Sequence, residues 1–430
     1  MLTRLDLRGA ALDRAALVAR LPRPGSAKDL PVAAVRAILA EVADRGDAAV
    51  RECTERFDGV AVDELAVPGE ELSAALASVP ADLRAGLEAA HDAIADFHRH
   101  QVVEIEPYRR GGVAVTTLRR PVARAGCYVP GGRASYPSSV LMTAVPARVA
   151  GVAEVVLCVP PGRDGRVAAA TLAAAAVAGV DEVYRIGGAQ AIAAMAYGTE
   201  SVRPVDVICG PGNLYVSVAQ REVAGRVGVP SSFAGPSEVV VVADGSVDAD
   251  LAAIDVVVQA EHGPDGLAWL LTWSEEVADA VSASVGALVE RSPRRAEIEA
   301  TLSDGGYAVV VDGPEAAMAV ANAIAPEHLE LLTADPEALV PLVESAGAVF
   351  TGPFAPASVG DYLAGPSHVL PTHGSARWAS ALTVSDFVRQ VHVIDLDREG
   401  LEEVGPHVVA VAEAEGLAAH AEAVRLRLSR

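Results

Sequence analysis

Between residues 154 and 351, short valine-rich runs alternate with longer alanine-rich stretches. The valine-rich runs have the length and composition of buried strands, and the alanine-rich stretches carry apolar residues at helical spacing. Strands that alternate with helices of roughly 10–15 residues form βαβ crossovers, and these give mostly parallel sheets with helices on both faces. We expect strands at 154–159, 183–186, 205–209, 238–243, 268–273 and 307–311. The pattern therefore predicts an α/β protein.

The chain of 430 residues contains more of these strands than one sheet of ordinary width accommodates. We therefore expect two doubly wound, incomplete Rossmann-like domains, with boundaries at the turns around Pro121 and Pro236. The last part of the chain is charged and has a helical pattern, so it is expected to form a tail. The predicted division is an N-terminal segment (1–29), a discontinuous first α/β domain (30–120 and 237–380), a second α/β domain (121–236) and a helical C-terminal tail (381–430).

Charge and composition exclude several classes of function. Acidic residues outnumber basic ones by 57 to 34, which gives a formal charge of −23, and Lys and Arg form no cluster. We therefore expect no binding to nucleic acid or to an anionic membrane surface. The longest near-apolar stretch, 167–180, is shorter than the roughly 20 residues that span a bilayer. The N-terminus lacks the apolar core of a signal peptide, and the 4 cysteines form no CxxC motif, so a reducing cytoplasm is expected.

Two glycine-rich turns each lie between a predicted strand and a predicted helix. They are Gly187-Gly188-Ala189-Gln190 and Gly210-Pro211-Gly212-Asn213. Ligands of open α/β sheets bind at the carboxyl ends of strands, where helix N-termini offer free N–H groups to phosphate. Neither turn is a GxGxxG motif, and glycine is common at such turns without any ligand. The turns alone leave a nucleotide site and a purely structural role open.

A polar pair closes the helix that is expected at 248–260. Gln259 and His262 are three residues apart, which places both side chains on one face, and Gly263-Pro264 stops the helix directly afterwards. A histidine there can simply cap the last carbonyls of the helix. The pair can equally be half of a metal site, but it then needs ligands from elsewhere in the fold.

An adjacent carboxylate and imidazole, Glu327-His328, follow Pro326. The proline pushes the residue before it out of the helical region, so the pair is expected on a helix-to-strand turn. Glu and His form a natural acid–base pair, because their surroundings can move both pKa values toward neutrality. The same adjacency also arises by chance.

Two later stretches carry residues of the same chemical types. Asp361 follows Gly360, which is common in ordinary turns, and His368 follows a few residues later. Glu415 and His420 lie on a terminal amphipathic stretch, where such residues usually form a solvated face. None of these residues indicates a function by itself.

Taken together and in this order, the motifs resemble those of the histidinol dehydrogenase family. The resemblance covers roughly residues 30–428, and its most specific parts are Gln-x-x-His-Gly-Pro-Asp from Gln259 and Pro-Glu-His-Leu from Pro326. The segment 228–234 is more polar than we expect of the family. The stretches that carry the resemblance are 127–132, 187–191, 210–213, 234–238, 259–264, 325–330, 360–362, 368–372 and 415–420.

The resemblance implies an oxidoreductase of histidine biosynthesis. It implies that L-histidinol is oxidised to L-histidine in two steps with two NAD⁺, and that each subunit holds one zinc ion. It also implies a homodimer in which the C-terminal tail crosses to the partner and completes a shared active site. The zinc ligands implied in this way are Gln259, His262, Asp361 and, from the other subunit, His420.

The resemblance also implies roles in catalysis and binding. Glu327 and His328 become the acid–base residues, and Ser237 and Glu415 help to hold the substrate together with the zinc ligands. His328 takes the alcohol proton in the first oxidation, and Glu327 activates water for attack on the bound aldehyde in the second. The residues implied to line the NAD site are Tyr128, Gln190 and Asn213.

Three other functions remain open at this point. A related NAD-dependent zinc dehydrogenase can act on another small alcohol with the same scaffold. A zinc hydrolase can use Gln, His and Asp ligands with a nearby Glu that activates water. A protein that binds metal without catalysis is the third. Glu327, His328, Glu415 and His420, all present in the expected spacing, favour the histidinol enzyme over a related dehydrogenase. Steady formation of NADH from histidinol would exclude the hydrolase.

Overall fold

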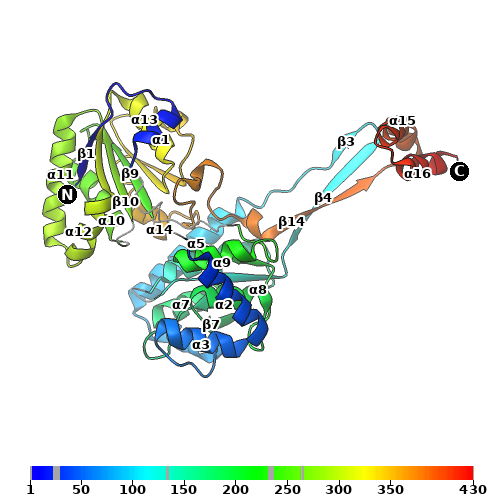
Figure 1. Cartoon of the computed structure of the whole chain (residues 1–430), viewed down its shortest axis with the longest axis horizontal. Helices are drawn as coiled ribbons and strands as arrows, with labels where there is room; N and C mark the ends of the chain where they lie inside the picture. The colour runs from blue at the N-terminus through cyan, green and yellow to red at the C-terminus, as the bar shows by residue number, and fades with distance from the viewer. Residues whose placement is uncertain are drawn as a thin grey trace.

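The structure is a computed structural model that describes residues 2–22, 30–131, 135–230, 237–261, 263 and 266–429. It has two α/β units that lie side by side and an arm that projects away from both (Figure 1). The predicted α/β class, with mostly parallel sheets and a helical C-terminal region, is confirmed. Within these described ranges, no helix combines the length and the apolar character that a membrane crossing requires.

The first unit, which we call unit A, is built on a parallel sheet with the strand order β1-β11-β10-β9-β12-β13. Its central strands are buried on both faces, as the valine-rich runs predict. The strands are β1 (Thr3–Asp6), β9 (Glu238–Ala243), β10 (Leu267–Thr272), β11 (Gly306–Val310), β12 (His328–Leu332) and β13 (Ala348–Thr351). One face is covered by α10 (Ala249–Ala260), α11 (Glu275–Arg291) and α12 (Arg295–Gly305). The other is covered by α1 (Arg14–Arg20) and α13 (Pro314–Ile324).

The second unit, unit B, has a sheet with the strand order β2-β7-β6-β5-β8, in which only β2 is antiparallel to its neighbour. The strands are β2 (Ala66–Val67), β5 (Arg124–Tyr128), β6 (Glu154–Val159), β7 (Glu182–Arg185) and β8 (Val207–Cys209). One face packs against α2 (Val32–Arg45), α3 (Asp47–Asp58), α8 (Gly188–Tyr197) and α9 (Leu214–Val223). The other packs against α4 (Gly69–Ser78), α5 (Ala81–Arg99), α6 (Pro137–Val149) and α7 (Ala169–Val177).

The layers divide the chain differently from the predicted boundaries. We expected residues 30–120 to join residues 237–380, but their helices α2–α5 cover the sheet of unit B, and β2 pairs with β7. We expected 1–29 to be a separate segment, but β1 pairs with β11 at the edge of unit A. The apolar face of an amphipathic helix indicates that the helix packs on a sheet, but it does not indicate which sheet.

The arm combines a ribbon of strands with a pair of helices. Strands β14 (Val388–Asp395), β4 (Val113–Pro121) and β3 (Tyr108–Arg110) form an antiparallel sheet, and α15 (Arg398–Ala414) and α16 (Ala418–Leu428) pack on each other at its end. The tail predicted as helical from 381 is thus first a strand, because β14 pairs with β4 along its whole length. A Cβ on Gly112 would lie 2.2 Å from the Gly400 Cα, so glycine is required where the ribbon meets α15.

A few short elements complete the chain. Helix α14 (Ala357–Tyr362) follows β13 and reaches the space between the two units. Three 3₁₀ turns lie at Val340–Leu342, Ser375–Arg377 and Val384–Phe387.

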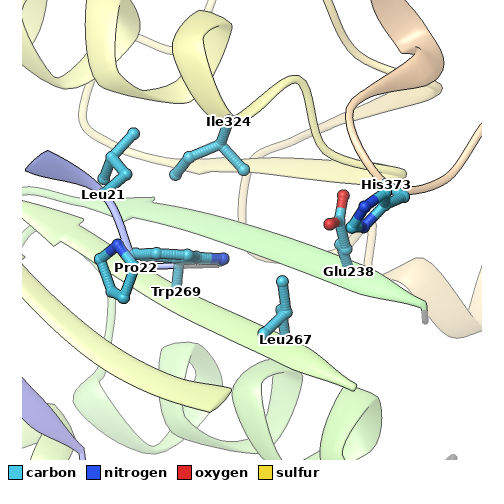
Figure 2. Close-up of a pocket in the computed structure, with 7 residues that line it drawn as sticks. All are labelled: Leu21, Pro22, Glu238, Leu267, Trp269, Ile324 and His373. Atoms are coloured by element: carbon cyan, nitrogen blue, oxygen red, sulfur yellow. The ribbon is translucent and has the colours of Figure 1, made fainter. Parts of the chain in front are cut away.

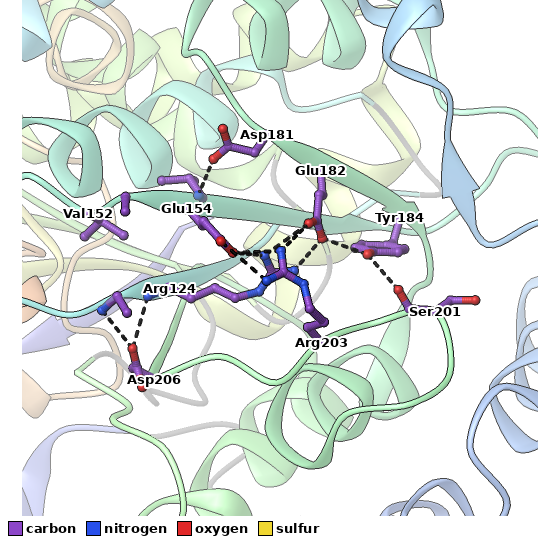
Figure 3. Close-up of polar contacts among 12 residues, drawn as sticks. Arg124, Val152, Glu154, Asp181, Glu182, Tyr184, Ser201, Arg203 and Asp206 are labelled. Atoms are coloured by element: carbon purple, nitrogen blue, oxygen red, sulfur yellow. Dashed lines mark hydrogen bonds and ion pairs between the residues drawn. The ribbon is translucent and has the colours of Figure 1, made fainter.

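An ion-pair network joins the amino ends of three neighbouring strands of unit B (Figure 3). Arg124 begins β5 and is almost fully buried, and its Nη1 lies 2.5 Å from Glu154 Oε2 on β6 and 3.2 Å from Glu182 Oε1 on β7. The exposed Arg203 contacts both carboxylates at 2.9 Å, and the Tyr184 hydroxyl donates to Glu182. The network lies at the end of the sheet opposite to the glycine-rich turns, so we assign it to stability.

We expect Arg124→Met to lower the free energy of unfolding by about 2–3 kcal/mol at pH 7. Breaking a buried ion pair typically costs about 3–5 kcal/mol, and partial exposure of both carboxylates reduces this loss. Burial opposes ionisation of Glu182, but hydrogen bonds from Arg124, Arg203 and Tyr184 lower its pKa to about 2. This stabilisation is therefore complete above the unfolded-state pKa of about 4.3 and is lost as the pH falls toward 2.

Urea unfolding at pH 7 and at pH 3 measures the effect, and the difference between wild type and Arg124→Met should shrink at pH 3. Arg203→Met is the matched control, because its side chain is 62% exposed and contacts the same carboxylates. It should cost less than about 1 kcal/mol. Equal losses in the two variants would contradict the assignment of the stabilising contact to Arg124.

Candidate active site between the two units

The adjacent Glu327 and His328 lie where α13 ends and β12 begins. Helix α13 ends at Ile324, its C-cap Ala325 has a left-handed φ of 54°, and Pro326 directs the chain into the strand. The expected helix-to-strand turn is therefore present. Gly347 approaches so closely that a Cβ there would lie 2.6 Å from the Glu327 carbonyl oxygen. This close approach fixes the pair at the amino end of the sheet of unit A.

Both side chains of the pair are buried and face polar partners. Nδ1 of His328 lies 3.8 Å from Glu327 Oε2, and Nε2 lies 3.6 Å from Oδ1 of Asp361 on α14. The amide of Glu238, the first residue of β9, donates to Glu327 Oε2 at 3.2 Å, and the Ser237 hydroxyl also bonds to this carboxylate. The structure thus brings together four of the residues singled out from the sequence: Ser237, Glu327, His328 and Asp361.

The electrostatics of the pair suit proton transfer. Burial raises the pKa of Glu327 above its ordinary value, although the His328 ring and the Glu238 amide oppose the shift. Burial alone lowers the pKa of His328, but the charges of Glu327 and Asp361 outweigh it, and the pKa of His328 is raised. A carboxyl group and an imidazole that titrate nearer neutrality can exchange a proton with a substrate at physiological pH.

A cavity of about 150 Å³ connects this pair with unit B. Ser237, Glu327 and His368 line one wall, and the turn after β8, Gly210 to Gly212, lines the other. His368 also fixes the wall in place, because its Nδ1 lies 2.9 Å from the Asp361 carbonyl oxygen and its Nε2 lies 3.4 Å from Ser139 Oγ on α6. A small substrate in this cavity would touch both units.

A larger cavity of about 600 Å³ lies along the carboxyl ends of the strands of unit B. The three residues predicted to contact NAD, Tyr128, Gln190 and Asn213, all line it. The Gly188 amide, in the first turn of α8, donates to the Tyr128 hydroxyl at 3.1 Å, and Asn213 Oδ1 accepts from two amides of α9. Helix N-termini and a volume of this size are typical of a site for a phosphate-bearing ligand.

Sequence reasoning missed Asp58, which also lines the larger cavity at the end of α3. Burial raises its pKa to about 6. It also missed the Glu238 amide that holds Glu327. A backbone donor leaves no signal in a sequence, and Asp58 reads as an ordinary last residue of a helix before Gly59.

The pocket drawn in Figure 2 is a packing gap beside the candidate site. It is bordered by apolar side chains such as Leu267, Trp269 and Ile324, and its volume of about 10 Å³ is about that of a single water. The side chain of Glu238 points toward His373 there, whereas its backbone amide serves Glu327. The pocket therefore offers no room for a ligand larger than a water molecule.

The proposed metal ligands are only partly visible in one chain. Gln259 is buried in the last turn of α10, and its Nε2 has no hydrogen-bond partner among the described residues. Asp361 lies beside His328, whereas His262 lies outside the described residues. Glu415 and His420 are exposed at the end of the arm, where α15 and α16 lie far from the sheet of unit A (Figure 1). Among the residues that the structure describes, no three His, Cys, Asp or Glu side chains are close enough to hold a metal.

A buried acid–base pair on one unit and a large cavity at helix N-termini of the other are the features expected of a two-domain α/β enzyme that binds a nucleotide. Residues 21–428 match the family model described as histidinol dehydrogenase. The chain therefore belongs to the histidinol dehydrogenase family, and the resemblance drawn from its motifs is confirmed.

Individual relatives agree with this assignment. The chain is 51% identical to histidinol dehydrogenase of Parasynechococcus marenigrum (strain WH8102), over 92% of this chain and 90% of that protein. It is 48% identical to the enzyme of Moorella thermoacetica (strain ATCC 39073 / JCM 9320), over 93% and 95%. The crystal structure of histidinol dehydrogenase from Elizabethkingia anophelis superposes with a TM-score of 0.94 at 33% identity, over 100% of this chain and 98% of that one.

Proposed function

We propose that the protein oxidises L-histidinol to L-histidine through bound histidinal and reduces two NAD⁺, as the last steps of histidine biosynthesis in the cytoplasm. The observation that carries the proposal is the position of Glu327, which lines a cavity whose other wall is a glycine-rich βα turn and lies beside His328, itself 3.6 Å from Asp361. Four free, buried cysteines agree with a reducing compartment.

The cavity of unit B is the proposed NAD site. Tyr128, Gln190 and Asn213 line it, and the buried Nε2 of Gln190 has no partner within the described part of the chain, so a bound ligand could satisfy it. When bound, NAD⁺ supplies the acceptor for the hydride that leaves the substrate carbon. The protein positions the cofactor beside the turn at Gly210, which also lines the smaller cavity.

The donor set fits one zinc ion per subunit. Gln259 is buried at the end of α10 and carries a side-chain carbonyl oxygen, and Asp361 provides a carboxylate beside His328. We propose that Gln259, His262 and Asp361, with His420 of the partner subunit, hold the metal. Nitrogen and oxygen ligands of this kind are acceptable to zinc, although a Gln carbonyl is less common. When bound, the zinc ion orients the imidazole and amine of the substrate.

The chain's own residues move the protons. In the first oxidation His328 takes the proton of the alcohol as the hydride leaves the adjacent carbon. In the second, Glu327 takes a proton from water as the water oxygen attacks the aldehyde carbon, and the resulting diol loses the second hydride. Burial of both side chains keeps bulk water from competing with the substrate for these two groups.

We further propose that two chains share each site in a homodimer. The arm exposes apolar side chains on both its strand and its helical part, including Ile394 at 66% and Val411 at 60%. Its helices pack on each other and on the ribbon end, so they have little core of their own. Docking on a second copy would cover this surface and bring Glu415 and His420 of the partner subunit to the substrate.

We expect two NADH per histidinol from purified protein, and loss of activity after chelation with recovery on addition of zinc. Without the metal, the substrate loses the group that orients it. NADH absorbance and elemental analysis of the treated protein measure the two quantities. Full activity of a verified metal-free preparation would contradict the zinc site. Amide hydrolysis without NADH formation would support a zinc hydrolase instead.

A further inference from the structure

Two acidic side chains contact each other inside the aliphatic layer that lies between α10 and the sheet of unit A. Glu330 on β12 is fully buried, and Asp255 on α10 is 8% exposed. Their carboxyl groups are hydrogen-bonded to each other, and Glu330 Oε1 also accepts from the amide of Ala357, the first residue of α14, at 3.2 Å. The residues around them in this layer include Val241 and Val256.

A hydrogen bond between two carboxyl groups needs a proton, because two carboxylates in contact repel each other in a poorly solvated site. Burial and the neighbouring Asp255 both raise the pKa of Glu330. The negative charge of Asp361 acts in the same direction. One of the two carboxyl groups therefore carries a proton, and we assign it to Glu330, which then donates to Asp255 while Oε1 accepts from the Ala357 amide.

Asp255, Glu330 and Ala357, the three residues joined by these hydrogen bonds, each lie close in sequence to a residue of the proposed site. Asp255 is one helical turn before Gln259 on α10, and Ala357 is one turn before Asp361 on α14. Glu330 is two residues after His328 on β12, so the two side chains share one face of the strand. The hydrogen bonds of Glu330 thus join the three elements that carry these site residues.

We propose that Glu330, as a neutral carboxylic acid hydrogen-bonded to Asp255 and to the Ala357 amide, is a positioning residue. It holds Gln259, His328 and Asp361 in place relative to one another. The inference rests on the proposed function, because it takes Gln259 and Asp361 to be metal ligands. Groups that orient metal ligands from outside typically change metal affinity about 10–100-fold when they are removed.

Glu330→Gln and Glu330→Leu separate the positioning role from simple packing. The Gln side chain can donate to Asp255 and accept from the Ala357 amide, as the neutral acid does, whereas Leu can do neither. We expect Glu330→Gln to keep zinc affinity, measured by competition with a chelator, within about 3-fold of wild type. Glu330→Leu should lose about 10–100-fold in zinc affinity.

Val241→Ala is the matched packing control, because Val241 on β9 is buried and directly opposite Glu330 in register. It should lower the Tm but leave zinc affinity within about 2-fold of wild type.

Infrared spectra report the proton independently of activity: wild type at pH 7 should show the C=O stretch of a buried protonated carboxyl, and Glu330→Gln should lack it. If Glu330→Leu does not fold, Glu330→Asp, whose shorter acid cannot span both partners, replaces it with an expected loss of about 10-fold.

Wild-type protein that neither binds zinc nor oxidises histidinol would overturn the proposed function. With an active wild type, equal zinc affinities in Glu330→Leu or Glu330→Asp and Val241→Ala would overturn the inference alone. A loss in Glu330→Gln as large as that in Glu330→Leu would overturn the protonated state, as would an infrared band that persists in Glu330→Gln.

Discussion

Replacing Glu327 with Gln is expected to slow the oxidation of histidinal far more than the oxidation of histidinol. The substitution removes the base for water, and loss of a general base typically costs about 10²–10⁴-fold in rate. His328 remains available to take the alcohol proton. The Gln oxygen can still accept from the Glu238 amide, which donates at 3.2 Å in the wild type, so the turn should keep its shape. Separate assays that start from histidinol and from histidinal measure the two rates.

His328→Asn supplies the matched comparison, because it should damage the first oxidation at least as strongly as the second. Thermal unfolding of both variants checks that the buried turn survives. If Glu327→Gln slows both oxidations by the same factor, the assignment of water activation to Glu327 is wrong.

Mixing two inactive variants, His262→Ala and His420→Ala, is expected to restore activity. If each site takes His420 from the partner subunit, one site of a heterodimer combines both defects and the other receives two intact histidines. About half of the sites in purified heterodimers should therefore be active, as the two-fold symmetry of a dimer requires. The parents should each lose most of their zinc, so activity should rise from near zero.

His407→Ala is the control on the arm, since His407 is also exposed on α15 and has no proposed role. It should be active without a partner variant. The experiment needs conditions under which wild-type subunits exchange and remain active. Purified heterodimers that are no more active than either parent would show that each chain completes its own site.

Local patterns predicted the parts of this molecule that depend on local chemistry. The alternation of valine-rich and alanine-rich segments predicted the parallel sheets, because buried strands and crossover helices differ in both composition and period. Pro326 predicted the turn at Glu327 and His328, since a proline limits the residue before it. The resemblance to a family then supplied the roles, which residue types alone left open between several enzymes.

Packing partners could not be predicted in the same way. Helices α2–α5 cover unit B although they follow β1, a strand of unit A, in the chain, and their apolar faces would fit either sheet. The contact between Asp255 and Glu330 joins a helix to a strand 75 positions later, and although Glu330 ends one of the motif stretches, nothing in the sequence indicates its partner. The sequence of β14 is charged and alternating, so it resembles the helical tail that follows it. Its pairing with β4 identifies it as a strand.

The pairing of β4 with β14 also bears on the order in which the molecule folds. Val388 pairs with Pro121 and Asp395 with Ala114, which are separations of 267 and 281 residues. All of β5–β13 lies between the two strands, so their pairing closes a very long loop. Contacts of such high sequence separation form slowly, because the entropy of loop closure must be overcome before they stabilise the chain. We therefore expect β4 and β14 to pair after both α/β units have become compact. The surface of the arm that would contact a second chain then forms last.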